Sequence, residues 1–181
     1  IPSLKSQLNS YLAANGGRAD ANALYTVWGG ANDVFAVAGG APAQATIGAA
    51  VASQAGMLAT LKAAGAQYVM VPSLPDIGLT PASRAGGPVA MAQGTALAKA
   101  YNDALFGGLK QAGLQVIPID TFGILQEIVA NPGAYGFSNV SGTACQPQVT
   151  AQSLTCTPLN YVTPNAADTY VFADGVHPTT A

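Results

Sequence analysis

The residues best suited to proton transfer stand close together near the end of the 181-residue chain. The motif Asp-Gly-Val-His at residues 174–177 holds the chain's only histidine. An unperturbed histidine titrates near neutral pH, so it can accept a proton and return it. A carboxylate three residues earlier can orient the imidazole and stabilise its charged form. Asp174 and His177 are therefore candidates for the orienting acid and the general base of an acyl-transfer site.

The residues beside this pair favour a turn. Gly175 lies inside the motif, and Pro178 follows His177 directly. Because the residue before a proline avoids the helical region, His177 is expected in extended backbone. Pro178 suits the first turn of a helix, so a helix is predicted to begin there. Taken alone, Asp-x-x-His is also compatible with an incidental histidine.

A second polar cluster comes much earlier, where Gly-Ala-Asn-Asp at residues 30–33 follows an apolar run. An asparagine amide in a glycine-rich turn after a strand can donate to the oxyanion that develops during acyl transfer. Asn32 is thus a candidate oxyanion donor. The alternative is that Asn32 and Asp33 cap the next helix, because both residue types cap helices well.

The composition excludes several classes of function. Only 8% of the residues are charged, and the six cations are scattered, whereas a typical soluble domain has about 25% charged residues. With a net charge of -2, nucleic-acid binding is not expected. The uncharged run from Val34 to Leu61 contains glycine, proline and glutamine, which favours a packed helix over a membrane span. One histidine without clustered carboxylates is a weak ligand set, so no metal is expected.

The two cysteines, Cys145 and Cys156, lie in a stretch rich in Gln, Ser, Thr and Pro. Neither has the spacing of a metal site. They are predicted to form a disulfide, which favours an exported protein. Two free thiols in a cytosolic protein are the alternative. The chain begins with Ile1, which fits either a removed signal segment or an internal cut.

Helix and strand patterns alternate along a chain whose length suggests one domain. Apolar spacing predicts helices over residues 1–14, 47–61, 97–109 and 122–130. Strands are predicted over residues 24–28, 68–71 and 114–119. Such alternation gives a parallel sheet with helices on its faces, and ligands bind beyond the carboxyl ends of its strands. Residues 134–172 are expected to form a long irregular loop stabilised by the disulfide.

The clusters at residues 30–33 and 174–177 together resemble the third and fifth blocks of the SGNH (GDSL) hydrolase family. The likeness covers essentially the whole chain. The chain is particularly similar to the passenger domains of secreted bacterial autotransporter esterases and lipases. The segments that carry it are residues 6–12, 24–33, 74–81 and 174–181. The resemblance implies a flavodoxin-like three-layer α/β/α fold with a parallel sheet, and hydrolysis of carboxylic esters.

The resemblance also implies a role for each site residue. Asp174 would be the orienting acid, His177 the general base and Asn32 an oxyanion donor. Gly30 and Asp33 match the motif, and Asp33 is assigned a structural role. No cofactor is implied, and the substrate would be a small-molecule or lipid ester met outside the cell or at the bacterial surface. Lipase, arylesterase, phospholipase and carbohydrate-ester activities are all compatible with these residues.

The sequence departs from the family pattern at the nucleophile. The family carries it in an N-terminal Gly-Asp-Ser block, but none of the seven aspartates here precedes a serine. No Gly-x-Ser-x-Gly elbow occurs either. The glycine of the second block and the first family strand have no match before Trp28, and Ala181 comes where the family's last helix would begin.

Residues 1–181 are therefore expected to be a single SGNH domain that is incomplete at both ends and inactive alone. The serine would lie on an upstream segment or a partner chain. The alternative is a non-catalytic secreted binding or surface-display module on the same fold.

Overall fold

The computed structural model of the protein describes residues 2–150 and 152–181. Two compact units account for the chain, and each is made of two segments. The first unit comprises residues 1–74 and 97–121, and the second comprises residues 75–96 and 122–181. The single-domain organisation stays a prediction.

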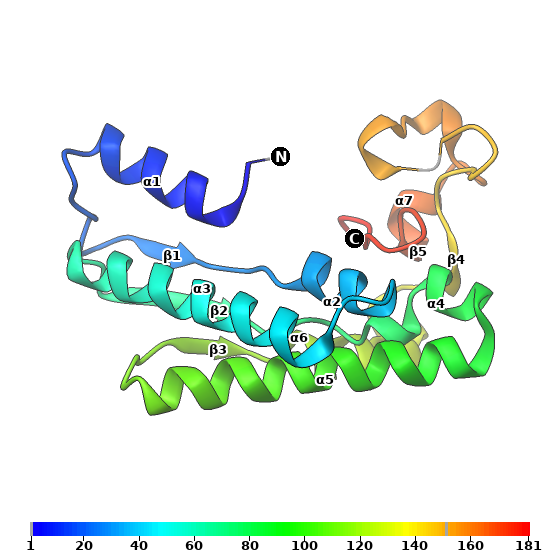
Figure 1. The fold of residues 1–181 in the computed structure, drawn as a ribbon. Helices are drawn as coiled ribbons and strands as arrows, with labels where there is room; N and C mark the ends of the chain where they lie inside the picture. The colour runs from blue at the N-terminus through cyan, green and yellow to red at the C-terminus, as the bar shows by residue number, and fades with distance from the viewer. Residues whose placement is uncertain (1, 151) are drawn as a thin grey trace. The chain divides into compact units, whose positions relative to one another are not determined.

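The first unit is built on a parallel sheet with the strand order β1-β2-β3 (Figure 1). Its strands are β1 (Leu24–Thr26), β2 (Tyr68–Pro72) and β3 (Ile117–Ile119). Its helices are α1 (Leu4–Ala14), α2 (Ala31–Ala38), α3 (Ala43–Ala63) and the second part of α5 (Gly87–Gln111). Helices connect successive parallel strands, which is the predicted α/β arrangement.

The core of the first unit forms where α3 and α5 bring leucines to the central strand. The buried residues that share this role are Leu58, Leu61, Val69, Val71, Leu105 and Leu109. Burying each such side chain stabilises the fold by about 1.5–3 kcal/mol. The buried Asn102 of α5 accepts from the Leu74 amide at 2.7 Å and donates to the Leu74 carbonyl at 2.9 Å. The chain is thereby fixed where it leaves β2.

Two strands of this unit are shorter in the structure than the sequence predicts. The strand predicted over residues 24–28 ends at Thr26, and that predicted over 114–119 begins at Ile117. In β3, Pro118 pairs with Val71 of β2. The strand β3 lies at one edge of the β1-β2-β3 sheet, a position where proline is tolerated. The helix α2 was not predicted, because eight residues barely complete two turns of apolar periodicity.

The second unit contains a smaller parallel sheet made of β4 (Asn139–Thr143) and β5 (Tyr170–Phe172). Its helices are α4 (Pro81–Ala85), α6 (Thr121–Ala130), α7 (Ala166–Thr169) and the first part of α5. The first residue of α6, Thr121, is assigned to the first unit. Short 3-10 turns are η1 (Ile77–Leu79), η2 (Pro132–Tyr135), η3 (Ser153–Thr155) and η4 (Pro158–Asn160). Leu125, Val171 and Phe172 form its apolar core.

Two expectations about this unit were wrong. Residues 134–172 are not wholly irregular, since they include β4, α7 and β5. Pro178 does not begin a helix. It forms an antiparallel bridge with Phe172, and the Thr179 amide donates to the Val171 carbonyl at 2.9 Å. The segment after His177 returns along β5, because its amides can donate to backbone carbonyls of that strand. A helix starting at Pro178 would leave those carbonyls without these donors.

No helix among the described residues combines the length and the apolarity needed to cross a membrane.

A buried carboxylate holds η1, α5 and α6 together inside the second unit. Asp76 accepts from the Gly78 amide at 3.0 Å, the Thr95 hydroxyl at 2.6 Å and the Gln126 side-chain amide at 2.8 Å. Gly78 permits this approach, because a Cβ there would overlap the Met91 carbonyl and the Thr95 hydroxyl. Three donors thus depend on one side chain.

We expect Asp76→Ala to lower the free energy of unfolding by about 2–3 kcal/mol, since buried donors lose their acceptor. Urea unfolding monitored by circular dichroism measures this change. Asp103→Ala is the matched control, because Asp103 pairs with Lys99 on an exposed helix surface, where such pairs contribute little. Equal midpoints for Asp76→Ala and Asp103→Ala would contradict the structural role of Asp76.

Candidate active site

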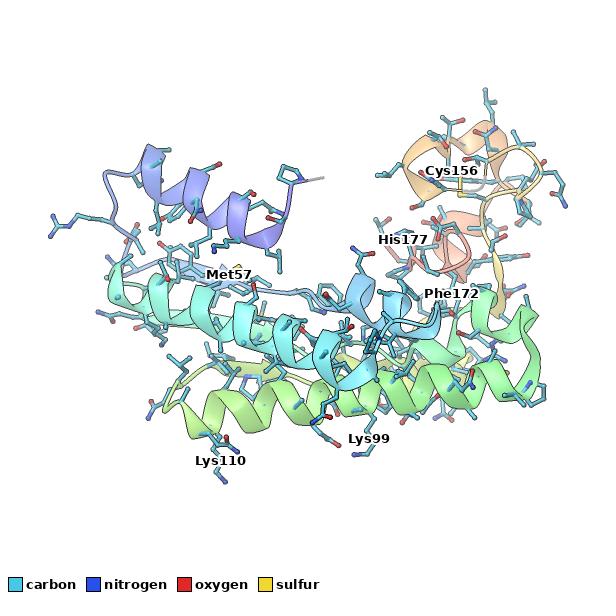
Figure 2. All side chains as sticks on the ribbon, viewed as in Figure 1. Met57, Lys99, Lys110, Cys156, Phe172 and His177 are labelled. Carbon is cyan, nitrogen blue, oxygen red and sulfur yellow. A yellow bond between two sulfur atoms is a disulfide. The ribbon has the colours of Figure 1, made fainter. Side chains whose placement is uncertain are left out.

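The turn that carries Asp174 and His177 is closed by its own backbone. It follows β5 directly, and the Ala173 amide donates to the His177 carbonyl at 2.8 Å. The helix α4 supports the turn from the same unit, since the Ala82 amide donates to the Gly175 carbonyl at 2.9 Å. Figure 2 shows His177 on this C-terminal segment, near Phe172 of β5. Strand, turn and bridge therefore fix the backbone of the pair.

Asp174 collects hydrogen bonds on both carboxylate oxygens. Its Oδ1 accepts from the amides of Val176 at 2.9 Å and His177 at 2.8 Å. Its Oδ2 accepts from the Ser153 amide at 2.7 Å and lies 2.8 Å from His177 Nδ1. The Asp174 side chain is 5% exposed, whereas the His177 side chain is 62% exposed. The acid is buried and satisfied, and the imidazole is presented to solvent.

The electrostatics of the pair follow from these contacts. Burial opposes ionisation of Asp174, but the backbone amides of Val176, His177 and Ser153 outweigh it, with help from the His177 ring. The pKa of Asp174 is consequently held well below its ordinary value. A neutral imidazole that donates Nδ1–H to this carboxylate keeps its lone pair on Nε2. His177 can therefore act as a proton acceptor through Nε2.

The Gly-Ala-Asn-Asp turn belongs to the first unit. Gly30 occupies the N-cap position of α2 with φ 109°, and Asn32 and Asp33 lie in the first helical turn. The alternative that Asn32 or Asp33 caps the helix is wrong, because the cap position is already taken by Gly30. The Asn32 side chain is exposed. Asp33 suits the structural role predicted for it, since a carboxylate in the first turn interacts favourably with the helix dipole.

Tyr101 explains why this turn needs a glycine. A Cβ at Gly30 would overlap the buried Tyr101 ring, and its positive φ is strained for other residues. The Tyr101 hydroxyl donates to Gln54 Oε1 at 2.7 Å, and Gln54 donates to the Val27 carbonyl. Burial, with the nearby charge of Asp33, raises the pKa of Tyr101 to about 12, so the hydroxyl stays protonated. Sequence reasoning missed Tyr101, for which Gly30 was the only signal.

The predicted residues fall into two groups. Asp174 and His177 are brought together, and Cys145 and Cys156 of the same unit form the predicted disulfide with an S–S distance of 2.03 Å. Gly30, Asn32 and Asp33 lie together in the other unit, and the oxyanion role of Asn32 stays a prediction. No group of three or more potential metal ligands occurs within residues 2–150 and 152–181.

Sequence reasoning also missed Ser153. Its contribution is a backbone amide, which no side-chain pattern reveals. The available signal was its position inside the loop that the two cysteines close.

Comparison with known proteins gives consistent results. Residues 2–181 match the family model described as GDSL-like Lipase/Acylhydrolase. The chain is 37% identical over 175 residues to "Esterase EstA" of Pseudomonas aeruginosa, covering 92% of this chain and 25% of that protein. It is 26% identical over 239 residues to "Lipase 1" of Photorhabdus luminescens, covering 97% of this chain and 37% of that protein.

A third relative is the "Uncharacterized protein in trpE-trpG intergenic region" of Pseudomonas putida. It is 34% identical over 171 residues, covering 93% of this chain and 28% of the relative. The chain thus spans between about a quarter and two fifths of the length of these relatives.

The low pKa of Asp174 predicts how stability depends on pH. Because the folded pKa lies below the unfolded one, the stabilisation from Asp174 is complete above about pH 5. It is lost as the pH falls below about 3.9, toward the folded value. We expect wild type to exceed Asp174→Asn in unfolding free energy at pH 7, and the gap to shrink by pH 3. Urea titrations across this range measure the gap.

The control for this pH series is Asp103→Asn, whose carboxylate is exposed and should give a small gap at every pH. A gap for Asp174→Asn that is the same at pH 3 and pH 7 would contradict the low pKa.

Proposed function

The chain belongs to the GDSL-like lipase/acylhydrolase family, and we propose that it supplies the acid–base half of a serine ester hydrolase. The observation that carries this proposal is the contact between Asp174 and His177. A buried carboxylate with a low pKa holds Nδ1, and the exposed ring carries the basic Nε2. A histidine held in this way is suited to take a proton from a serine hydroxyl.

The proposed reaction has two stages. A serine Oγ attacks the ester carbonyl carbon while its proton passes to His177 Nε2, and the carbonyl oxygen becomes an oxyanion. The bond to the alcohol oxygen then breaks, and the alcohol leaves with the proton from His177. Water repeats the attack on the acyl-serine, which releases the acid and restores the serine. Asp174 stabilises the imidazolium throughout, and the Asn32 side-chain amide donates to the oxyanion.

The nucleophilic serine is proposed to lie on a segment outside these residues, because the chain contains no Gly-Asp-Ser. The exposed edge of the first unit supports this view. The strand β1 lies at an edge of the β1-β2-β3 sheet, and its Leu24 is 57% exposed. Apolar residues on an open edge favour the addition of a further strand.

A neighbouring hollow supports the same view. An apolar hollow of about 180 Å³ lies between α1, β1 and α3, with Leu8, Tyr25 and Met57 in its wall. The Tyr11 hydroxyl, 2.7 Å from the Tyr25 hydroxyl, holds α1 against β1 at this place. A segment that adds to β1 has side-chain space available beside it.

A non-catalytic binding module on the same fold is the second candidate, and the absence of Gly-Asp-Ser favours it. Either form is proposed to be exported, since the disulfide between Cys145 and Cys156 suits an oxidising compartment.

We expect residues 1–181 alone to leave a nitrophenyl ester unhydrolysed, and the serine-bearing segment to restore turnover when added. His177→Ala in the restored enzyme should remove nearly all activity, because residues 1–181 contain no other histidine to act as the general base beside Asp174. Lys99→Ala is the control, since Lys99 pairs with Asp103 on an exposed surface. Turnover by the isolated chain would contradict the external serine, and no turnover with the segment would favour the binding module.

Asn32→Ala should lower kcat of the restored enzyme by about 100- to 1000-fold, because one oxyanion donor is lost. The Michaelis constant should change little, since the interaction forms in the transition state. The matched control is Asn22→Ala: Asn22 is exposed, and its backbone N–H makes the bond to Asp20. A loss below tenfold for Asn32→Ala would assign the oxyanion donor to another group.

A further inference from the structure

One hydrogen bond to Asp174 comes from far along the chain. The amides of Val176 and His177 lie in the same turn as the carboxylate, but Ser153 precedes it by 21 residues. Ser153 lies between Cys145 and Cys156 and begins the turn η3. The loop closed by the disulfide therefore reaches the predicted catalytic acid through a single backbone amide. Figure 2 shows Cys156 on this loop, which belongs to the same unit as His177.

The disulfide closes a ring of contacts around the carboxylate of Asp174. The Cys145 amide donates to the Ala173 carbonyl at 2.9 Å, next to Asp174. The disulfide joins Cys145 to Cys156, whose amide donates to the Ser153 carbonyl at 3.1 Å. The Ser153 amide then returns to Asp174 Oδ2 at 2.7 Å. Each link fixes the next, so the amide is held over the carboxylate by the disulfide.

We propose that the disulfide-closed loop positions the acid–base pair, with the backbone amide of Ser153 as the positioning group. Its influence on turnover rests on the proposed function, whereas its influence on Asp174 and His177 does not.

The physical reason lies in the two jobs of Asp174 Oδ2. This oxygen accepts the Ser153 amide and lies 2.8 Å from His177 Nδ1, while Oδ1 lies 2.9 Å from the same nitrogen. The His177 ring is largely exposed, so the carboxylate supplies much of its orientation. Without the Ser153 amide, Oδ2 keeps only its contact with the exposed ring, and the amides of Val176 and His177 on Oδ1 are left to resist rotation about the last torsion, which has a broad energy minimum. A misplacement of about 1 Å at a reacting group can lower a rate by about 100-fold.

Within residues 2–150 and 152–181, the ion pair found for Asp174 is the one with His177. Residues 128–167, which include β4 and the whole disulfide loop, contain no charged side chain. The helix α4 packs against the turn and carries Arg84, whose Nε donates to the Leu79 carbonyl. Beyond its own turn, Asp174 is therefore served by the loop.

Ser153→Pro removes the donor with little other change. Proline lacks the N–H, and it is tolerated at the first position of a helical turn. Gln152, which precedes it, has φ -132° and ψ 135°, the extended backbone that a residue before proline adopts. Ser153→Ala keeps the N–H and is the reference. The double variant Cys145→Ser with Cys156→Ser leaves the Ser153 amide in place but removes the disulfide from the ring of contacts.

The first readout is the titration of Asp174 in protein labelled with ¹⁵N-histidine. The single His177 gives one set of imidazole signals, which shift when the adjacent carboxylate is protonated. Ser153→Pro should raise the pKa of Asp174 relative to Ser153→Ala, because one donor to the charged form is lost. The cysteine pair variant should shift it in the same direction. Equal titrations in Ser153→Pro and Ser153→Ala would overturn the proposal.

If Ser153→Pro does not fold, the cysteine pair variant takes its place, and a titration equal to wild type overturns the role of the disulfide.

The second readout is turnover by the enzyme restored with its serine-bearing segment. Ser153→Pro should have a kcat about tenfold or more below that of Ser153→Ala, with KM little changed, because positioning affects the reacting groups. The two proposals fail separately. A raised Asp174 pKa without any turnover in wild type rejects the esterase and keeps the positioning role. Wild-type turnover with equal kcat in both Ser153 variants keeps the esterase and rejects the positioning role.

Discussion

The buried carboxylate of Asp174 sets the requirements for the site in the second unit. Desolvating a charge costs several kcal/mol unless hydrogen bonds compensate it. Asp174 meets this requirement with amides from its own turn, one amide from the disulfide loop and the ring of His177. The strand β5 delivers the carboxylate, the bridge between Phe172 and Pro178 closes the chain behind it, and the disulfide holds the distant donor. The exposed imidazole can therefore be basic while its partner stays charged.

The first unit meets a different constraint at the Gly-Ala-Asn-Asp turn. There the backbone must pass a buried tyrosine ring, and only glycine allows it at position 30. Tyr101 is itself held by Gln54, whose side-chain amide reaches the carbonyl of Val27. These hydrogen bonds link α5 to α3, and α3 to the segment between β1 and α2. The two motifs that resemble family blocks are thus both fixed by buried hydrogen bonds from elements distant in sequence.

The sequence predicted those parts of the protein whose causes are local. An aspartate and a histidine three residues apart in a turn meet without help from the rest of the fold, and the two cysteines had no other partner. The long amphipathic helices and the parallel strands also follow from apolar spacing. In contrast, β4 reads Asn-Val-Ser-Gly-Thr and lacks the alternation that marks a strand. The Ser153 amide and the Tyr101 ring act through tertiary contacts, which no local pattern encodes.

In the proposed function, His177 activates a serine that lies outside residues 1–181. Labelling the restored enzyme with a fluorophosphonate, followed by peptide mapping, tests it most directly, because this reagent phosphonylates activated serines. We expect a label on one serine of the added segment, none on this chain, and loss of labelling in His177→Ala. A label on a serine within residues 1–181, or unchanged labelling in His177→Ala, would contradict it.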